Sequence, residues 1–183
     1  NNDSAYETAA NLFKKGISIE AIIDNREEID SKLIKESEKN NIKIYKGYTI
    51  VDTYGYKRIN KISIMQLSKD GQKVVGSKIL IPCDCLGISG GWTPSVHLFT
   101  QSGGKLKFRD NDQVFIPNTY PSDQISIGSC NGDFTLDEIL SNISKTLKEF
   151  LGVNKTGYEN LEVQTSFNKS KRNIWLLPSD KIV

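Results

Sequence analysis

The sequence predicts an α/β protein in which a parallel layer is followed by an antiparallel meander. Strand-like apolar runs alternate with amphipathic helical segments over residues 3–45, which is typical of parallel pairing with right-handed crossovers. Three strand-like runs then follow one another over residues 48–80, separated by turns that contain glycine. Glycines also end two later apolar runs, at residues 89–91 and 128, which predicts a return to α/β structure.

The parallel layer is predicted as helix, strand, helix and strand. The first helix begins at Asp3-Ser4, where Glu7 stands three residues after Ser4 as in a capping box, and it ends at Gly16. The three elements that follow are a strand over Ile19–Asp24, a helix over Ile29–Asn40 and a strand over Ile42–Tyr45.

The meander is predicted over residues 48–54, 58–67 and 73–80. Asp70-Gly71 predicts a hairpin turn between the last two runs, in which both central residues have positive φ.

The second half begins with a strand that contains Cys83 and Cys85 and ends at Ser89-Gly90-Gly91. A hairpin over residues 105–116, a strand over 124–127 and a long helix over 135–150 are predicted next. The last segment, 153–183, is polar except for an apolar patch at 174–178 that includes Trp175.

Composition excludes several classes of function. Among 183 residues, 24 basic and 22 acidic side chains leave a net charge of +2, which gives no electrostatic reason for a nucleic-acid partner. No apolar run approaches the roughly 20 residues of a membrane helix. The cysteines form no disulfide framework, and Cys83 and Cys85 are expected to be buried small side chains in a reducing cytoplasm. No metal site is predicted, because His97 is the only histidine.

Four blocks of sequence, in order, resemble the α subunits of heterotetrameric sarcosine oxidases. These blocks are Asn2-Asp3-Ser4-Ala5-Tyr6, Asp24-Asn25-Arg26, the run from Ser89 to Leu98, and the run from Gly128 to Leu136. More broadly, the order of elements resembles the disulfide-reductase-like flavoproteins with two dinucleotide-binding domains.

The resemblance implies a partial FAD/NAD(P)-binding, Rossmann-like two-domain fold. Residues 1–82 are expected to form an inserted NAD-binding-like domain without its first strand, and residues 83–152 the return to the FAD/NAD-binding host domain. Residues 153–183 are expected to connect to a folate-binding domain. Because the chain opens on Asn1, we expect it to be a piece of a longer polypeptide.

The implied activity is that of an oxidase complex that demethylates sarcosine to glycine, with hydrogen peroxide and either formaldehyde or 5,10-methylenetetrahydrofolate. The resemblance implies structural NAD in this subunit, FAD and FMN in the wider complex, and tetrahydrofolate in the missing domain. The implied partners are the rest of the α subunit and the β, γ and δ subunits. No residue of this chain is expected to perform a chemical step.

The first candidate site lies where the predicted parallel layer begins. Asp24 ends the second strand of the expected fold, where an acidic side chain binds a ribose hydroxyl and favours NAD. Arg26 either pairs with Asp24 in a solvated loop or accepts a phosphate. Asp3 and Ser4 are interpreted as ordinary helix caps rather than phosphate ligands, because Asp3 would repel a phosphate.

The second candidate site is Gly128-Ser129. Many members of the flavoprotein superfamily have an aspartate after this glycine that binds the flavin ribityl chain, and Ser129 replaces it here, which fits NAD in a flavin-like groove. Asp133 is interpreted as a capping charge in the first turn of the long helix. Ser89, Gly90 and Gly91 are predicted either to line the same groove or to permit domain packing.

Other residues are predicted to have structural roles, and two alternative functions of the chain remain open. His97 is predicted to be a packed histidine with one hydrogen bond, and Trp92 and Trp175 are predicted to be interface or core anchors. The rival functions are an α-type subunit of another FAD/NAD-dependent amino-acid or opine dehydrogenase, and an interaction module with a vestigial nucleotide pocket.

Overall fold

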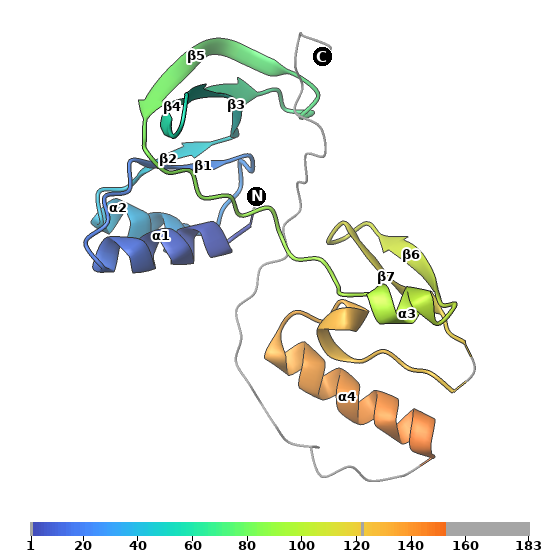
Figure 1. Cartoon of the computed structure of the whole chain (residues 1–183). Helices are drawn as coiled ribbons and strands as arrows, with labels where there is room; N and C mark the ends of the chain where they lie inside the picture. The colour runs from blue at the N-terminus through green and yellow to red at the C-terminus, as the bar shows by residue number, and fades with distance from the viewer. Residues whose placement is uncertain (1, 122, 153–183) are drawn as a thin grey trace. The chain divides into compact units, whose positions relative to one another are not determined.

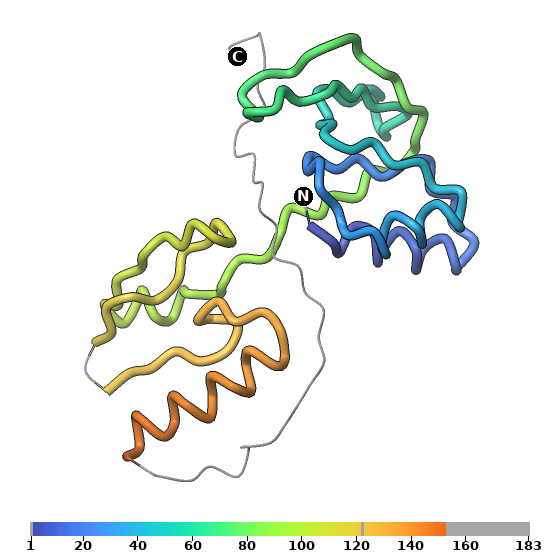
Figure 2. The backbone as a smooth tube through the Cα atoms, turned by 180° about the vertical axis from the view of Figure 1, so that it is seen from behind, coloured from blue at the N-terminus to red at the C-terminus, as the bar shows by residue number. Residues whose placement is uncertain are grey.

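A computed structural model describes residues 2–121 and 123–152, so the predictions made for 153–183, Trp175 included, lie outside the described residues. The described residues form two compact units, unit 1 up to Gly91 and unit 2 from Trp92 (Figures 1 and 2). The predicted α/β class, with a parallel layer and an antiparallel meander, is confirmed. The predicted domain boundaries remain a prediction.

Unit 1 begins with two helices and two parallel strands in alternation. The pairing runs in register from Ala21 opposite Lys43 to Asp24 opposite Lys46. The elements are α1 (Ser4–Lys14), β1 (Ala21–Asp24), α2 (Ser31–Lys39) and β2 (Lys43–Lys46). These strands and helices are the predicted ones, with ends shifted by up to two residues.

The meander that follows is a three-stranded antiparallel sheet in the order β3-β4-β5. The connection between β4 and β5 spans residues 68–73, and within it Gly71 has a left-handed φ of 73° whereas Asp70 does not. The predicted hairpin therefore forms, but through a longer turn than Asp70-Gly71 alone. The strands are β3 (Tyr48–Gly55), β4 (Ile59–Leu67) and β5 (Val74–Pro82).

Strand β1 lies between two apolar cores, because successive side chains of a strand point to opposite faces. Ile22 packs with Tyr6 and Ala9 of α1 on one face. Ala21 and Ile23 pack on the other face, against the core of the meander. Figure 1 shows the resulting layers, with α1 and α2 on one side of β1 and β2 and the meander on the other. The same alternation directs Asp24 toward α1.

Helix α1 ends as predicted but begins differently. The N–H of Gly16 donates to Phe13 O (2.9 Å) and that of Ile17 to Leu12 O (3.1 Å), with Gly16 left-handed, which is a Schellman ending. At the start, Asp3 makes no side-chain capping bond. Asp3 thus takes the predicted N-cap position, but the side-chain acceptor at this end of the helix is Asn2, whose Oδ1 accepts from the N–H of Ser4 (3.0 Å).

The predicted strand through Cys83 and Cys85 does not form, since β5 ends at Pro82 and residues 83–96 have no regular structure. A strand requires a neighbour for its ladder of hydrogen bonds, and among the described residues none pairs with this segment. Cys83 packs against the meander core, whereas Cys85 is exposed, so the prediction of two buried thiols is wrong for Cys85.

Unit 2 contains the predicted hairpin and the predicted long helix. Phe99 of its short first helix is buried, and its ring packs edge-on against Tyr120 (ring centroids 5.0 Å apart). The elements are α3 (His97–Gln101), β6 (Lys105–Arg109), β7 (Val114–Thr119), the 3₁₀ helix η1 (Gly128–Asn131) and α4 (Leu136–Leu151).

Three predictions for unit 2 are wrong. Residues 124–127 form no strand, again without a ladder partner among the described residues. Asp133 lies three residues before the first residue of α4 and is buried rather than in the first turn. His97 is exposed, so it is not a packed histidine. Trp92 is also exposed, so of its two predicted roles the core one is excluded and the interface one remains a prediction.

No helix in the described part of the chain combines the length and apolar character that crossing a bilayer requires.

Candidate nucleotide site

Asp24 and Arg26 form a buried ion pair at the end of β1. Arg26 donates to Asp24 Oδ1 from its backbone N–H (3.0 Å) and Nε (3.1 Å), and to Oδ2 from Nη2 (2.9 Å). The two residues are 2% and 7% exposed. The predicted ion pair between Asp24 and Arg26 is therefore present. It is buried, however, whereas the sequence interpretation placed it in a solvent-exposed loop.

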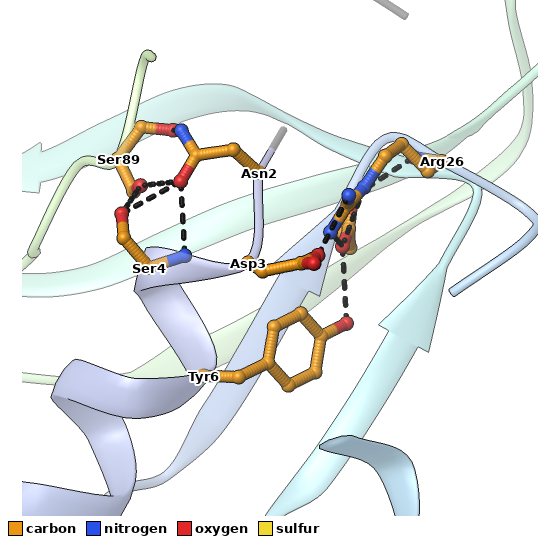
Figure 3. A network of polar contacts seen from close by, with 7 residues as sticks. Asn2, Asp3, Ser4, Tyr6, Arg26 and Ser89 are labelled. Atoms are coloured by element: carbon orange, nitrogen blue, oxygen red, sulfur yellow. Dashed lines mark hydrogen bonds and ion pairs between the residues drawn. The ribbon is translucent and has the colours of Figure 1, made fainter. Parts of the chain in front are cut away.

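Helix α1 and the residue before it supply two further members of this cluster, Tyr6 and Asp3 (Figure 3). The Tyr6 hydroxyl donates to Asp24 Oδ2 (3.0 Å), and the Asp3 carboxylate lies 2.8 Å from Arg26 Nη1. Sequence reasoning missed both, because each contact joins residues on different elements. The only signal for Tyr6 is its position on the apolar face of a predicted helix.

The protonation states of this cluster follow from its contacts. Burial raises the pKa of Asp24, but hydrogen bonds from Arg26 and its charge outweigh burial and hold that pKa below its ordinary value. Burial, followed by the charge of Asp24, raises the pKa of the Tyr6 hydroxyl, which remains a donor at neutral pH. Asp24 is thus a carboxylate, and its two oxygens accept from Arg26 and Tyr6.

The N-terminus of α1 is bound to the segment that follows β5. Asn2 Oδ1 accepts from the hydroxyls of Ser4 (2.6 Å) and Ser89 (2.9 Å), and Asn2 Nδ2 donates to Ser89 O (3.3 Å), as Figure 3 shows. Ser89 therefore holds its own segment against α1. A Cβ built on Gly90 or Gly91 meets no described atom within 4 Å, so neither glycine is required by close packing.

The other predicted residues, Gly128 and Ser129, lie in unit 2 at the start of η1. Gly128 is buried and left-handed, with φ 76°, a conformation that favours glycine. Ser129 is exposed. The turn closes where the N–H of Asp133 donates to Gly128 O (3.2 Å), which places Asp133 beside the predicted pair.

Asp133 is the residue of this turn that sequence reasoning misassigned. It is 7% exposed; its Oδ1 accepts from Asn142 Nδ2 (2.9 Å), and its Oδ2 has no hydrogen-bond partner among the described residues. A buried carboxylate oxygen without a donor is costly, and a ligand hydroxyl would satisfy it.

Arg109 supports the turn from the hairpin. Its Nη2 donates to Gly132 O (2.7 Å), and Nε donates to Asp112 Oδ1 (2.7 Å). A Cβ on Gly132 would lie 2.7 Å from Arg109 Nη2 and 2.8 Å from Ile116 Cγ2, so glycine is required there. Hydrogen bonds to Asp112 raise the pKa of Arg109, which stays charged.

Among the described residues, no group of three or more histidine, cysteine or acidic side chains is placed to hold a metal ion.

Comparison with known proteins identifies relatives of the predicted kind. No protein-family model matches the chain. The sarcosine oxidase subunit alpha of Corynebacterium sp. strain P-1 is 29% identical over 142 residues, which is 76% of this chain and 14% of that protein. The subunit of the same name from strain U-96 is 26% identical over 182 residues, 97% of this chain and 18% of that protein.

The chain resembles sarcosine oxidase α subunits. That resemblance, predicted from four sequence blocks, is confirmed. The chain spans less than a fifth of the length of either sarcosine oxidase α subunit.

Two solved structures also match part of the chain. One is thioredoxin reductase of T. acidophilum, with a TM-score of 0.47 and 19% identity, covering 78% of this chain and 49% of that chain. The other is L-proline dehydrogenase of P. horikoshii, with a TM-score of 0.39 and 19% identity, covering 72% of this chain and 26% of that chain.

Proposed function

We propose that this chain is the nucleotide-binding part of a sarcosine oxidase-type α subunit, in which it holds NAD in a structural role at the turn 128–133. The proposal rests on the two relatives named sarcosine oxidase subunit alpha and on the geometry of that turn. The whole complex would convert sarcosine, water and O₂ to glycine, formaldehyde and hydrogen peroxide. With tetrahydrofolate in place of water, the one-carbon product is 5,10-methylenetetrahydrofolate.

The observation that supports the turn as the site is the Oδ2 atom of Asp133. This buried oxygen has no donor among the described residues, and it lies in a turn closed by the bond from Asp133 N to Gly128 O. A ribose hydroxyl of NAD would donate to it, and the exposed Ser129 hydroxyl is available beside it for a second polar contact.

The residues of this turn would bind and orient the nucleotide. Gly128 allows the left-handed turn, Arg109 holds the carbonyl of Gly132, and Asp133 orients a hydroxyl. We assign no described residue to a chemical step. Sarcosine oxidation would take place at flavin, FAD or FMN, elsewhere in the complex, which includes β, γ and δ subunits.

The first test counts the nucleotides that the full-length protein contains. The protein is co-expressed with its partner subunits and denatured, and the released small molecules are identified by mass spectrometry. Asp133→Asn keeps the oxygen that accepts from Asn142 but replaces the free acceptor by a donor. Loss of a charged hydrogen bond of about 1.5–3 kcal/mol would weaken NAD binding roughly tenfold or more.

Gly128→Val and Gly87→Ala complete the experiment. Gly128→Val forces a β-branched residue into φ 76° and should abolish NAD retention. Gly87→Ala is the control, because a Cβ there meets no described atom within 4 Å. Release of flavin alone would replace this proposal by a flavin- and NAD-dependent amine or opine dehydrogenase subunit. Release of no nucleotide would favour an interaction module.

A further inference from the structure

A dinucleotide in a Rossmann-like fold contacts two places that unit 1 contains. The pyrophosphate lies at the N-terminus of the first helix, and an acidic side chain after the next strand binds the ribose. In unit 1 these places are the start of α1 and the residue Asp24 at the end of β1. The 2.8 Å ion pair between Asp3 and Arg26 brings them side by side.

The start of α1 is already bound by protein groups. Asn2 is 3% exposed, and its Oδ1 accepts from the backbone N–H of Ser4, which a phosphate oxygen would otherwise use. The same oxygen accepts from the hydroxyls of Ser4 and Ser89. A phosphate would have to displace a side chain that makes four hydrogen bonds, including the one that Asn2 Nδ2 donates to Ser89 O.

The side chain of Asp24 is likewise bound by protein groups. It is 2% exposed, and its two oxygens accept from the Arg26 guanidinium, the Arg26 N–H and the Tyr6 hydroxyl. A ribose hydroxyl would have to replace the Tyr6 hydroxyl or a charged donor, and it would bring no stronger bond than the one it displaced.

The net charge of the cluster disfavours the binding of both NAD and NADP. Asp3 and Asp24 together outnumber Arg26, the one cation paired with them in the structure described, so the cluster is net negative. Arg26 is the side chain that could accept the extra phosphate of NADP, but it is 7% exposed and pairs with two carboxylates. A phosphate here meets repulsion instead of a free cation.

We infer that unit 1 is closed to dinucleotides, because Asn2, Asp3 and Arg26 fill the places that a pyrophosphate and a ribose would take. The Asp3 carboxylate pairs with Arg26 in the way that a phosphate of a bound nucleotide would. The inference does not depend on the proposed site in unit 2.

The experiment uses the full-length protein with its partners and NAD⁺ and NADP⁺ as the probes. Hydrogen–deuterium exchange of peptides that contain residues 2–6 and 22–26 is compared with and without each nucleotide at millimolar concentration. We expect unchanged exchange in these peptides with both nucleotides. Protection of either peptide that saturates with nucleotide concentration would overturn the inference.

Two variants test the same inference without hydrogen–deuterium exchange. Asp24→Asn should unfold at lower urea concentration yet retain the NAD content of the wild type, whereas Asp84→Asn, at an exposed carboxylate, should change neither. A several-fold fall in NAD content in a folded Asp24→Asn protein would overturn the inference, whereas NAD retained at wild-type level in Gly128→Val would overturn the proposed site at the turn 128–133. A wild type without NAD overturns the proposed function instead, and the exchange experiment still decides this inference.

Discussion

Arg26 is the residue on which the interior of unit 1 most depends. Its guanidinium contacts Asp24 at the end of β1 and Asp3, the residue before α1, and all three side chains are largely buried. Removing one partner from such a cluster leaves an uncompensated buried charge, which costs more than the pair contributes. Arg26 is therefore a structural residue. Without it, the carboxylates of Asp3 and Asp24 would repel each other with no cation paired to them.

We expect Arg26→Met to destabilise the protein by about 3–5 kcal/mol near neutral pH, as for other broken buried pairs. The measurement is urea unfolding followed by circular dichroism. Arg58→Met is the matched control, because the Arg58–Asp84 pair is 3.9 Å long and its side chains are 79% and 81% exposed. Equal unfolding midpoints for the two variants would contradict the structural role of Arg26.

The same substitution should change the pH dependence of stability. The pKa of Asp24 is lowered in the folded state, so its contribution is present above the unfolded pKa of about 4 and is lost as the pH falls through the folded value. In Arg26→Met, burial acts without the cation and raises the pKa of Asp24. Asp24 of the variant then takes up a proton in the folded state before it does so in the unfolded chain, so the stability difference between Arg26→Met and the wild type should be largest near neutral pH and should shrink as the pH falls toward the unfolded pKa of about 4.

At the scale of elements, α4 is the helix whose start is best defined. Thr135 accepts from the N–H of Glu138 (3.3 Å), and Glu138 accepts from the N–H of Thr135 (3.4 Å), which forms a capping box. Gly152 follows its last turn in a left-handed conformation. No residue of the helix is fully buried, so we expect the loss of its cap to be measurable in its local stability.

Thr135→Ala should destabilise unit 2 by about 1 kcal/mol, because it removes the cap of α4. Thr146→Ala, in the middle of the same helix, should be neutral or slightly stabilising, since alanine has the higher helix propensity. Exchange of the amides of residues 135–142, measured by mass spectrometry, distinguishes the two variants. Faster exchange in Thr146→Ala than in Thr135→Ala would show that the cap is unimportant.

The elements also show where sequence patterns predict structure and where they do not. Helices and hairpins are predicted from local signals, such as the turn near Gly71 and the helical spacing of apolar residues in α4, among them Leu136, Ile139, Leu140 and Ile143. The segments 83–88 and 124–127 have strand-like sequences but form no strand, because a strand exists only when a neighbour completes its ladder.

At the scale of the molecule, the described residues have separate cores in two units. Ile64 is fully buried in the core of the meander, where it packs with Ile62 and Ile81. The cores of unit 1 share strand β1, so a defect in the meander should reach β1.

Ile64→Ala should cost about 2–5 kcal/mol, from lost burial and the cavity left behind. Hydrogen–deuterium exchange should accelerate in β1, β3, β4 and β5 while the hairpin β6–β7 keeps its wild-type protection. Ile88→Ala, at a residue that is 85% exposed, is the control and should change stability by less than about 0.5 kcal/mol. Equal acceleration in both units would mean that they unfold as one.

The α/β class, the order of most elements and the resemblance to sarcosine oxidase α subunits can be predicted from the amino-acid sequence, because they depend on local periodicity, turn residues and short motifs. For Arg26 it left two roles open, pairing with Asp24 or accepting a phosphate. The folded structure shows that the two residues pair, that the pair is buried, that Asp3 and Tyr6 join it, and that Asp133 has an oxygen without a donor among the described residues. Burial and hydrogen-bond partners depend on residues distant in sequence, and no local pattern specifies them.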